Sequence, residues 1–268
     1  MNNTFGFIGT GNMGGALAKA AAKAVAKDAL FVADKFAPKA QALAAELGCQ
    51  AVSVEEVAKN CGYIFLGVKP QMLQELFCQI GPVLRERTDG FTLVSMAAGV
   101  AMADIQRMAG ADYPVIRIMP NIPVAVGQGV VLYDHTENVS EEAVAVFCEN
   151  MRFAGLLDKL PEKLIDAGSA VSGCGPAFAC LFMEALADGG VACGLPRAKA
   201  MEYAQQMLLG TAALLLEDTL HPAQLKDAVC SPGGSTIAGV RALEQGGFRA
   251  AAMNAVEEAY YRTKELGK

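Results

Sequence analysis

Three glycines near the amino terminus place the strongest constraint on how this chain can fold. Gly9, Gly11 and Gly14 stand in "TFGFIGTGNMGG", after a short apolar run and before an Ala-rich one. In a strand–turn–helix unit, the first allows a tight turn, the second lets a pyrophosphate approach, and the third lets the helix pack on the strand. The start of the helix then faces the phosphates. The pattern predicts a Rossmann-like dinucleotide-binding unit and favours it over a glycine-rich turn without a ligand.

The rest of the first half repeats this alternation of short β-type and Ala-rich runs, which is typical of a doubly wound parallel sheet. We expect strands at Thr4–Ile8, Leu30–Ala33, Gln50–Val52, Tyr63–Val68, Thr92–Met96, Val115–Ile118, Val130–Tyr133 and near Gly155–Leu157. Helices are expected at Met13–Lys27, Pro38–Leu47, Pro70–Ile80 and Ser140–Arg152, and Ser53 is expected to cap a helix that contains Glu55, Glu56 and Val57.

The character of the chain changes near "DKLPEK", because no convincing strand follows. We therefore expect a Rossmann-like α/β domain over residues 1–161 and an all-helical domain for substrate binding and dimerisation over residues 162–268. The stretch Cys174–Leu195 contains glycines and two acids, so we interpret it as a buried helix and its exit rather than a membrane span. Helices at Ala177–Ala187 and Arg197–Leu216 carry few charges, which favours a subunit interface over a compact monomeric bundle.

Charge and cysteine usage exclude some classes of function. A net charge of -6, with no basic run and no Trp, argues against nucleic acid as a partner. The eight cysteines form no CxxC pair, and there are only two histidines, so we expect small buried thiols and no metal site. A strand-like run begins at Thr4, which leaves no room for a signal peptide ahead of it. We expect a reduced, cytoplasmic protein.

Asp34 and Lys35 stand where the second strand should end, at the offset expected of an acid that binds a ribose hydroxyl. A carboxylate there favours NAD, because it repels a 2′-phosphate, whereas Lys35 favours NADP. A solvated ion pair is a third interpretation. These residues alone leave the choice between NADH and NADPH open.

Other predicted strand ends should border the same cofactor, since ligands of such sheets lie at the carboxyl ends of the strands. They lie in "LGVKPQ", "SMAAGV" and "RIMPNIP". Lys69 could reach a phosphate or ribose, and Pro120 and Pro123 stiffen the turn around Asn121, whose amide would suit a nicotinamide or a substrate. The alternatives are a solvated lysine and a loop rigidified by its prolines.

A second anion site is suggested by "VCSPGGSTIAGV", residues 229–240. We expect Pro232 at an early helical position, with Gly233 and Gly234 exposing main-chain N–H groups; an ordinary helix cap is the alternative. The glycine-rich turns of this half have no Lys, His or Tyr beside them to act as a general base. A protonated imine needs little acid–base catalysis. An imino acid with a carboxylate would therefore suit a site that has an anion-binding turn but no general base.

The chain resembles the Δ1-pyrroline-5-carboxylate reductases almost from end to end. The resemblance rests on "GFIGTGNMGGALA", "VKPQ", "SMAAGV", "RIMPNIPVAVGQG", "AVSGCGPAF", "ADGGVACGLPR" and "SPGGSTIAGVRALEQGGFR". It implies reduction of a cyclic imine to L-proline with NADPH or NADH, the final step of proline biosynthesis, by a homodimer or a larger homo-oligomer. In this family the cofactor domain of one subunit is paired with the helical domain of its partner.

The resemblance also implies roles for particular residues. Main-chain groups of Asn12 and Met13 would meet the cofactor phosphates. The nicotinamide side would be lined by Val68, Lys69, Pro70, Ala97 and Asn121. The substrate carboxylate would be held by Ser231, Gly234, Ser235 and Thr236. The hydroxyl of Thr236 would lie near the ring nitrogen as a hydrogen-bond partner or proton relay.

The chain departs from the family pattern at four places. Cys174 replaces a common Ser and Ser235 a common Thr, both small changes. Asp34-Lys35 and Ser53-Val54 replace residues that often hold the 2′-phosphate, which puts a strong NADPH preference in doubt. Two rivals stay open: a hydroxyacid dehydrogenase with Lys199 or Lys226 as its catalytic lysine, and a non-catalytic NAD(H) sensor, which would need no second anion turn.

Overall fold

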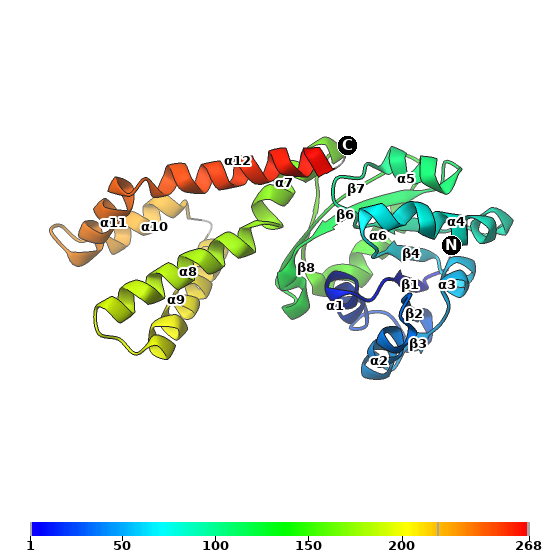
Figure 1. The fold of residues 1–268 in the computed structure, drawn as a ribbon, viewed down its shortest axis with the longest axis horizontal. Helices are drawn as coiled ribbons and strands as arrows, with labels where there is room; N and C mark the ends of the chain where they lie inside the picture. The colour runs from blue at the N-terminus through cyan, green and yellow to red at the C-terminus, as the bar shows by residue number, and fades with distance from the viewer. Residues whose placement is uncertain (1, 219, 267–268) are drawn as a thin grey trace. The chain divides into compact units, whose positions relative to one another are not determined.

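The computed structural model describes residues 2–218 and 220–266 (Figure 1). Each predicted strand is present within about two residues of its expected bounds. The strands are β1 Phe5–Ile8, β2 Leu30–Ala33, β3 Gln50–Ala51, β4 Tyr63–Leu66, β5 Thr92–Ser95, β6 Val115–Pro120, β7 Gly129–His135 and β8 Gly155–Lys159.

The strands form one sheet in the order β3-β2-β1-β4-β5-β6-β7-β8. Neighbouring strands are parallel except for β6 and β7, which are antiparallel. The expected doubly wound sheet is therefore present, and it is parallel apart from this pair. A parallel connection needs a crossover of about a dozen residues or more, and residues 121–128 are too few for one.

Helices cover both faces of the sheet. They are α1 Asn12–Ala21, α2 Ala37–Leu47, α3 Val54–Asn60, α4 Leu73–Glu86, α5 Met102–Ala109, α6 Glu141–Met151 and α7 Glu162–Ser172, with short 3-10 turns η1 Lys27–Ala29, η2 Pro70–Met72, η3 Ile122–Val126 and η4 Arg152–Ala154. Helix α1 ends earlier than expected, because the chain turns there and buries Val25. Helix α4 continues beyond Pro82, since its apolar face keeps Ile80 and Leu84 in the core.

The core lies on the two faces of this sheet. One cluster joins the sheet to α1, α2 and α6, and the other joins it to α3, α4 and α5. On the first face Phe5 stacks on Tyr63 at 4.6 Å and Phe7 on Phe65 at 4.1 Å between ring centroids. Packing on both faces holds the strands in place, so the positions of their carboxyl ends are fixed. The candidate cofactor residues lie at these ends.

The remaining helices are α8 Gly175–Ala192, α9 Arg197–Asp218, α10 Pro222–Val229, α11 Ser235–Gln245 and α12 Phe248–Leu266. The chain divides into two compact units: residues up to Cys174 together with the segment from Ala259, and Gly175–Glu258. This division differs from the expected boundary between residues 161 and 162, because α7 packs with the sheet. Buried Arg117 of β6 binds Asp166 of α7 at 2.7 Å and lies 3.4 Å from Glu162.

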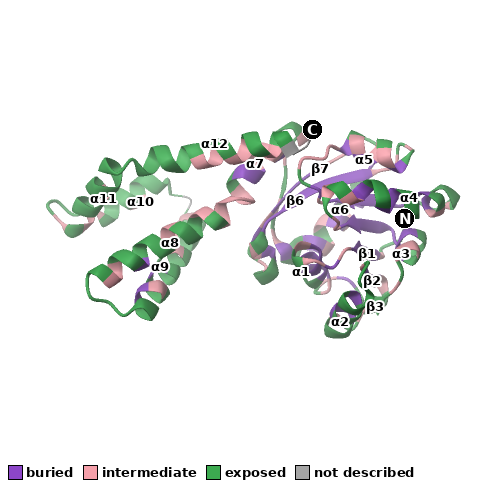
Figure 2. Ribbon diagram, viewed as in Figure 1, coloured by how far each residue is buried: buried purple, intermediate pink, exposed green. Residues whose placement is uncertain are grey.

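The helices of the second unit are mostly exposed (Figure 2), and many of their exposed residues are large and apolar. In α8 only Ala187 is buried, whereas Leu181 is 66% exposed, and in α9 Leu209 is 62% exposed. The expected burial of the segment Cys174–Leu195 is therefore absent from the single chain. Among the described residues, the stretch Glu162–Ala192 is long and apolar enough to cross a membrane by length and composition alone, and only 11% of its most apolar window is buried. An exposed apolar surface of this kind is typical of an interaction site, for example one that packs against a second protein surface.

Candidate functional site

Three neighbouring strands end level with one another at the carboxyl edge of the sheet. Ile8 of β1 is in register with Ala33 of β2 and Leu66 of β4. The next residues are joined across the edge, because Gly9 N donates to the carbonyl oxygen of Ala33 at 2.8 Å and Gly67 N donates to that of Ile8 at 2.7 Å. The glycine turn, the tip of β2 and the tip of β4 therefore lie side by side.

The structure gives a different geometric reason for glycine at each of the three predicted positions. Gly9 has φ +93°, a conformation that residues with a side chain rarely adopt, and an added Cβ would lie 2.5 Å from the carbonyl oxygen of Gly67. A Cβ on Gly14 would lie 2.1 Å from the carbonyl oxygen of Gly9, so α1 packs directly on the turn. A Cβ on Gly11 would meet nothing within 4 Å. The space beside Gly11 is therefore open to a ligand.

The start of α1 is suited to an anion. Its N-cap residue Gly11 offers no side-chain cap, and its first turn, which includes Asn12 and Met13, carries no acid. The corresponding donors of three other helices are taken: Ser53 caps α3 as predicted, Ser140 caps α6, and Glu162 accepts from the first N–H of α5. A helix start without an acid or a cap attracts negative charge through its N–H groups and dipole.

Asp34 follows β2 and is held by donors on both of its oxygens. Oδ2 accepts from Thr10 N at 2.7 Å and from Thr10 Oγ1 at 2.9 Å, and Oδ1 accepts from Phe36 N at 3.0 Å. Burial alone would raise the pKa of Asp34, but the hydrogen bonds from Phe36 and Thr10 and the charge of Lys39 outweigh it and hold the pKa below its ordinary value of 3.8. The carboxylate is charged at neutral pH.

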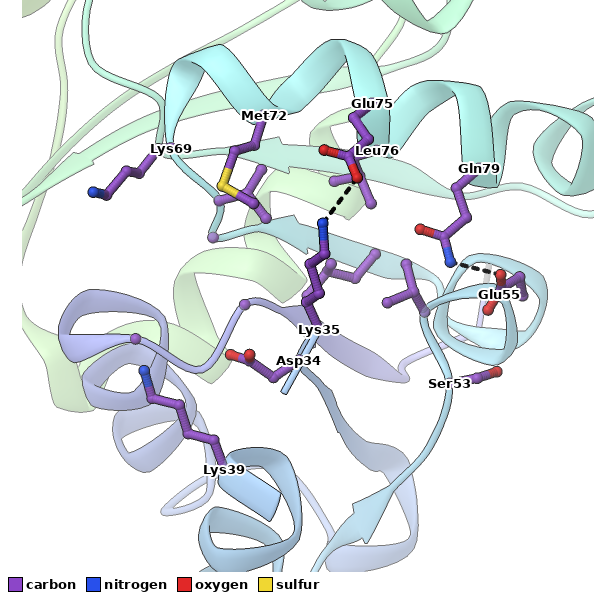
Figure 3. A pocket seen from close by; sticks show the side chains of 16 residues that line it. Asp34, Lys35, Lys39, Ser53, Glu55, Lys69, Met72, Glu75, Leu76 and Gln79 are labelled. Carbon is purple, nitrogen blue, oxygen red and sulfur yellow. Dashed lines mark hydrogen bonds and ion pairs between the residues drawn. The ribbon is translucent and has the colours of Figure 1, made fainter. Parts of the chain in front are cut away.

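A cavity of about 550 Å³ opens between these strand tips, the start of α3 and the helix that follows β4 (Figure 3). Six predicted residues line it: Gly9, Gly11, Asp34, Lys35, Val68 and Lys69. Ser53 and Val54, which stand where the family often holds the 2′-phosphate, line it too. Further lining residues were missed, namely Ile8, Lys39, Glu55, Gly67, Met72, Glu75, Leu76 and Gln79. Met72, Glu75, Leu76 and Gln79 are spaced as one face of a helix, and this spacing after "VKPQ" was the available signal.

One ion pair and one hydrogen bond join side chains across the cavity. Lys35 Nζ lies 2.9 Å from Glu75 Oε1 on α4, and Gln79 donates to Glu55 at 2.7 Å (Figure 3). The Ser53 hydroxyl accepts from Glu56 N at 3.1 Å, because it caps α3. Lys35 is thus directed towards α4 rather than towards the neighbouring Asp34.

Three predicted nicotinamide residues do not line this cavity. Pro70 begins η2 directly beside Lys69, as expected of proline in a first turn. Ala97 is 3% exposed and packs in the core. Asn121 follows β6 and is 7% exposed.

The amide of Asn121 already has a structural role. Nδ2 donates to the carbonyl oxygen of Ser172 at 2.9 Å, and Oδ1 accepts from Val130 N at 2.8 Å. Asn121 therefore ties the end of α7 to the β6–β7 connection. An amide has about two donor and two acceptor positions, so one of each is left for a ligand.

The second predicted anion turn lies wholly within the helical unit. Gly234 N donates to the carbonyl oxygen of Ser231 at 3.0 Å, and Gly233 has φ +70°. Proline followed by a glycine of positive φ is typical of a type II turn. Pro232 therefore lies in a turn, and the expectation that it occupies an early helical position was wrong. Helix α11 begins at Ser235.

This turn presents the uncapped start of α11. No side chain caps the helix at Gly234, and its first turn carries no acid. Within the described parts of the chain, 2–218 and 220–266, no acceptor is recorded for the N–H groups of Ser235 and Thr236. The Ser231 hydroxyl lies beside the helix start, since a Cβ on Gly234 would be 2.4 Å from Ser231 Oγ. The predicted substrate residues are thus neighbours around one helix start that carries no acid and no side-chain cap.

The two histidines have structural or surface positions. His221 caps α10 by accepting a hydrogen bond from Ala223 N at 3.2 Å. His135 lies 2.9 Å from Lys159 Nζ at the surface. Among residues 2–218 and 220–266, no three His, Cys, Asp or Glu side chains form a group suited to a metal ion.

Two family models match the chain, one in each half. The model described as "Pyrroline-5-carboxylate reductase dimerisation" matches residues 162–266. The model described as "NADP oxidoreductase coenzyme F420-dependent" matches residues 4–99, which include the glycine turn and Asp34.

Whole-chain relatives agree with the first model. Pyrroline-5-carboxylate reductase 3 of Macaca fascicularis is 38% identical over 266 residues, which cover 98% of this chain and 96% of that protein. Pyrroline-5-carboxylate reductase of Pisum sativum is 40% identical over 265 residues, with the same coverage. The crystal structure of the Plasmodium falciparum pyrroline carboxylate reductase with NADP bound has a TM-score of 0.86 and 32% identity, and the match covers 99% of this chain and 98% of that one.

Proposed function

The chain belongs to the pyrroline-5-carboxylate reductase family, and we propose from this premise how its residues share the reaction. The protein is an NAD(P)H-dependent oxidoreductase that reduces the C=N bond of Δ1-pyrroline-5-carboxylate to give L-proline, the final step of proline biosynthesis. The observation that carries this function is the similarity over 98% of the chain, which includes the glycine turn before α1 and the start of α11.

The amino-terminal unit holds the cofactor in this proposal. Its fit is supported by the open space beside Gly11, by the uncapped start of α1 at Asn12 and Met13, and by Asp34 at the tip of β2. When bound, NAD(P)H supplies the hydride. Lys69 meets the phosphates or the ribose, and Val68, Pro70, Ala97 and Asn121 line the nicotinamide side.

The helical unit holds the substrate. We assign the carboxylate to the N–H groups and hydroxyls of Ser231, Gly234, Ser235 and Thr236 at the start of α11, which carries no competing acid or side-chain cap. The Thr236 hydroxyl is assigned to the imine nitrogen, where it holds or relays the proton. A protonated imine is already electrophilic, so the site needs no strong base to activate it.

Both lysines named for the rival dehydrogenase chemistry are paired with acids. Lys199 Nζ pairs with Glu202 at 2.8 Å and Lys226 Nζ with Asp227 at 2.8 Å, all on exposed side chains. The hydrogen bond from Lys226 to Asp227 raises the pKa of Lys226, which makes that lysine a poorer general base at neutral pH.

The dimerisation family model indicates that the helical unit takes part in self-association. We assign it a homodimer, in which the exposed apolar side chains of α8 and α9, such as Leu181 and Leu209, are covered by the partner. The cofactor domain of one subunit then works with the helical domain of the other. We also assign the protein to the cytoplasm, in keeping with its eight free cysteines.

One assay tests the function. Purified protein is mixed with NADH or NADPH, and absorbance at 340 nm is followed after addition of Δ1-pyrroline-5-carboxylate, with 2-keto and 3-keto acids as controls. We expect oxidation of the cofactor and formation of proline with the imine only. Oxidation with a keto acid but not with the imine would contradict the assignment.

A further inference from the structure

We propose that this enzyme is built to use NADH in preference to NADPH, with Asp34 as the selecting residue and Thr10 as the residue that positions it. The inference deepens the proposed function, on which it rests, by naming the cofactor. It is carried by the hydrogen bonds of the Asp34 carboxylate and by the pairing of the side chains around it.

The first argument concerns the acceptor positions that are left on Asp34. A carboxylate offers about four of them, two on each oxygen. Thr10 uses two on Oδ2, and Phe36 N uses one on Oδ1. One acceptor position therefore remains, on Oδ1. A ribose hydroxyl has a proton to donate to it, so Asp34 is prepared for a hydroxyl.

The second argument concerns charge. A phosphate monoester carries about −1.5 to −2 charges near pH 7 and would meet the charged Asp34 carboxylate at close range. Two hydrogen bonds from Thr10 fix that carboxylate to the glycine turn, and a third fixes it to Phe36, so it cannot turn away without leaving three donors unpaired. The fixed Asp34 carboxylate would therefore repel a 2′-phosphate that binds beside it.

The third argument is that nearby groups do not supply a phosphate site. Lys35 is paired with Glu75 across the cavity, the Ser53 hydroxyl caps α3, and Glu55 adds another acid to the lining. Lys39 extends into the cavity beside Asp34 (Figure 3), but its charge is offset by that of the carboxylate. Attraction of a 2′-phosphate to Lys39 is therefore opposed by repulsion from Asp34, and Lys69, the remaining lysine of the lining, is assigned to the phosphates or the ribose.

Direct binding measures the preference. NADH and NADPH are titrated separately into the protein, with nicotinamide fluorescence as the readout, and adenosine 2′,5′-bisphosphate is compared with AMP by calorimetry. We expect the unaltered protein to bind NADH about tenfold or more tightly than NADPH, and AMP more tightly than the bisphosphate. Equal affinity, or tighter binding of NADPH, would overturn the proposal.

A matched pair of variants tests the residue. Asp34→Ser removes the charge, and we expect the NADH-to-NADPH affinity ratio to fall at least about fivefold, to near one or below. Asp28→Ser removes the same charge at the opposite end of β2, where Asp28 is exposed, and should leave the ratio unchanged. An unchanged ratio in Asp34→Ser would remove Asp34 from the selecting role. If that variant does not fold by circular dichroism, the titrations of the unaltered protein still decide the preference.

The imine assay separates this inference from the proposed function. Selective binding of NADH without imine reduction would contradict the function and leave the preference intact. Faster imine reduction with NADPH, at concentrations of both cofactors below saturation, would confirm the function and overturn the preference.

Discussion

Gly14 lies so close to Gly9 that the two glycines act as one structural element. A Cβ on Gly14 would be 2.1 Å from the carbonyl oxygen of Gly9, which is closer than any carbon and oxygen that are not bonded can approach. A Cβ on Gly11, three residues earlier, would meet nothing within 4 Å. One glycine of the motif therefore serves packing, and another keeps space for a ligand.

This difference predicts opposite results for two single-methyl changes. Gly14→Ala should lower the free energy of unfolding by at least about 2 kcal/mol, because α1 must move off the turn. Gly11→Ala should change stability by less than about 1 kcal/mol, since its φ of −64° suits alanine. It should nevertheless weaken binding of both reduced cofactors more than about tenfold, because the methyl occupies the pyrophosphate space. Thermal unfolding and fluorescence titration check the pair, and a stable Gly14→Ala protein would contradict the packing argument.

The Thr10 hydroxyl should affect cofactor binding without entering the chemical step. Thr10→Val keeps the shape and the main-chain N–H bond to Asp34 but removes the 2.9 Å hydroxyl bond. We expect the KM for NADH to rise about three- to tenfold with kcat nearly unchanged, the equivalent of one hydrogen bond of roughly 0.5–1.5 kcal/mol.

A double-mutant cycle supplies the control for this change. In an Asp34→Ser background, Thr10→Val should have little further effect on the affinity for NADH, because the partner of the hydroxyl is already gone. Additive effects of the two substitutions would show that Thr10 does not act through Asp34.

The contribution of Asp34 to stability should depend on pH in a defined direction. Its pKa in the folded protein lies below 3.8, so the folded state binds the proton less tightly than the unfolded state. The stabilisation is therefore present above the unfolded pKa and is lost as the pH falls through the folded pKa. The Tm difference between the unaltered protein and Asp34→Ser should be constant from about pH 5 to 8 and should shrink below about pH 4. A difference that grows in acid would contradict the hydrogen-bonded carboxylate.

Local chemistry explains which parts of the site could be predicted from the sequence. The roles of Gly9 and Gly14 and the place of Asp34 at the end of β2 follow from a strand–turn–helix unit a few residues long, and Ser53 was identified as a cap from its neighbours alone. The direction of β7 was missed although the short connection 121–128 determines it, because strand patterns carry no direction.

Other features depend on contacts between distant residues. Glu75 and Gln79 show helical spacing, but only packing of α4 on the sheet decides that this face borders the cavity. The Asn121 amide binds Ser172, which lies far along the chain, and no local pattern indicates that contact. Pro232 suits both a first helical turn and a type II turn, and the positive φ of Gly233 decides between them.

A substitution at Asn121 tests its structural role against a role in binding. Asn121→Asp removes the donor to Ser172 and places a carboxylate against a carbonyl oxygen in a buried position. We expect the free energy of unfolding at pH 7 to fall by about 1–3 kcal/mol. Loss of cofactor affinity with unchanged Tm would instead favour direct contact with the nicotinamide as its main role.

The hydroxyl of Thr236 gives the sharpest test of the substrate assignment, because serine and alanine separate its hydroxyl from its methyl group. Thr236 is the second residue of α11 and is only partly exposed. Thr236→Ala should lower kcat/KM for the imine by about 10²-fold or more if the hydroxyl holds or relays the proton at the ring nitrogen. Thr236→Ser keeps the hydroxyl and should stay within a few-fold of the unaltered enzyme. The affinity for NADH should be nearly the same in all three proteins, since the assigned cofactor residues lie in the other unit. A fall in cofactor affinity alone, with normal turnover of the imine at saturating NADH, would remove Thr236 from the substrate site.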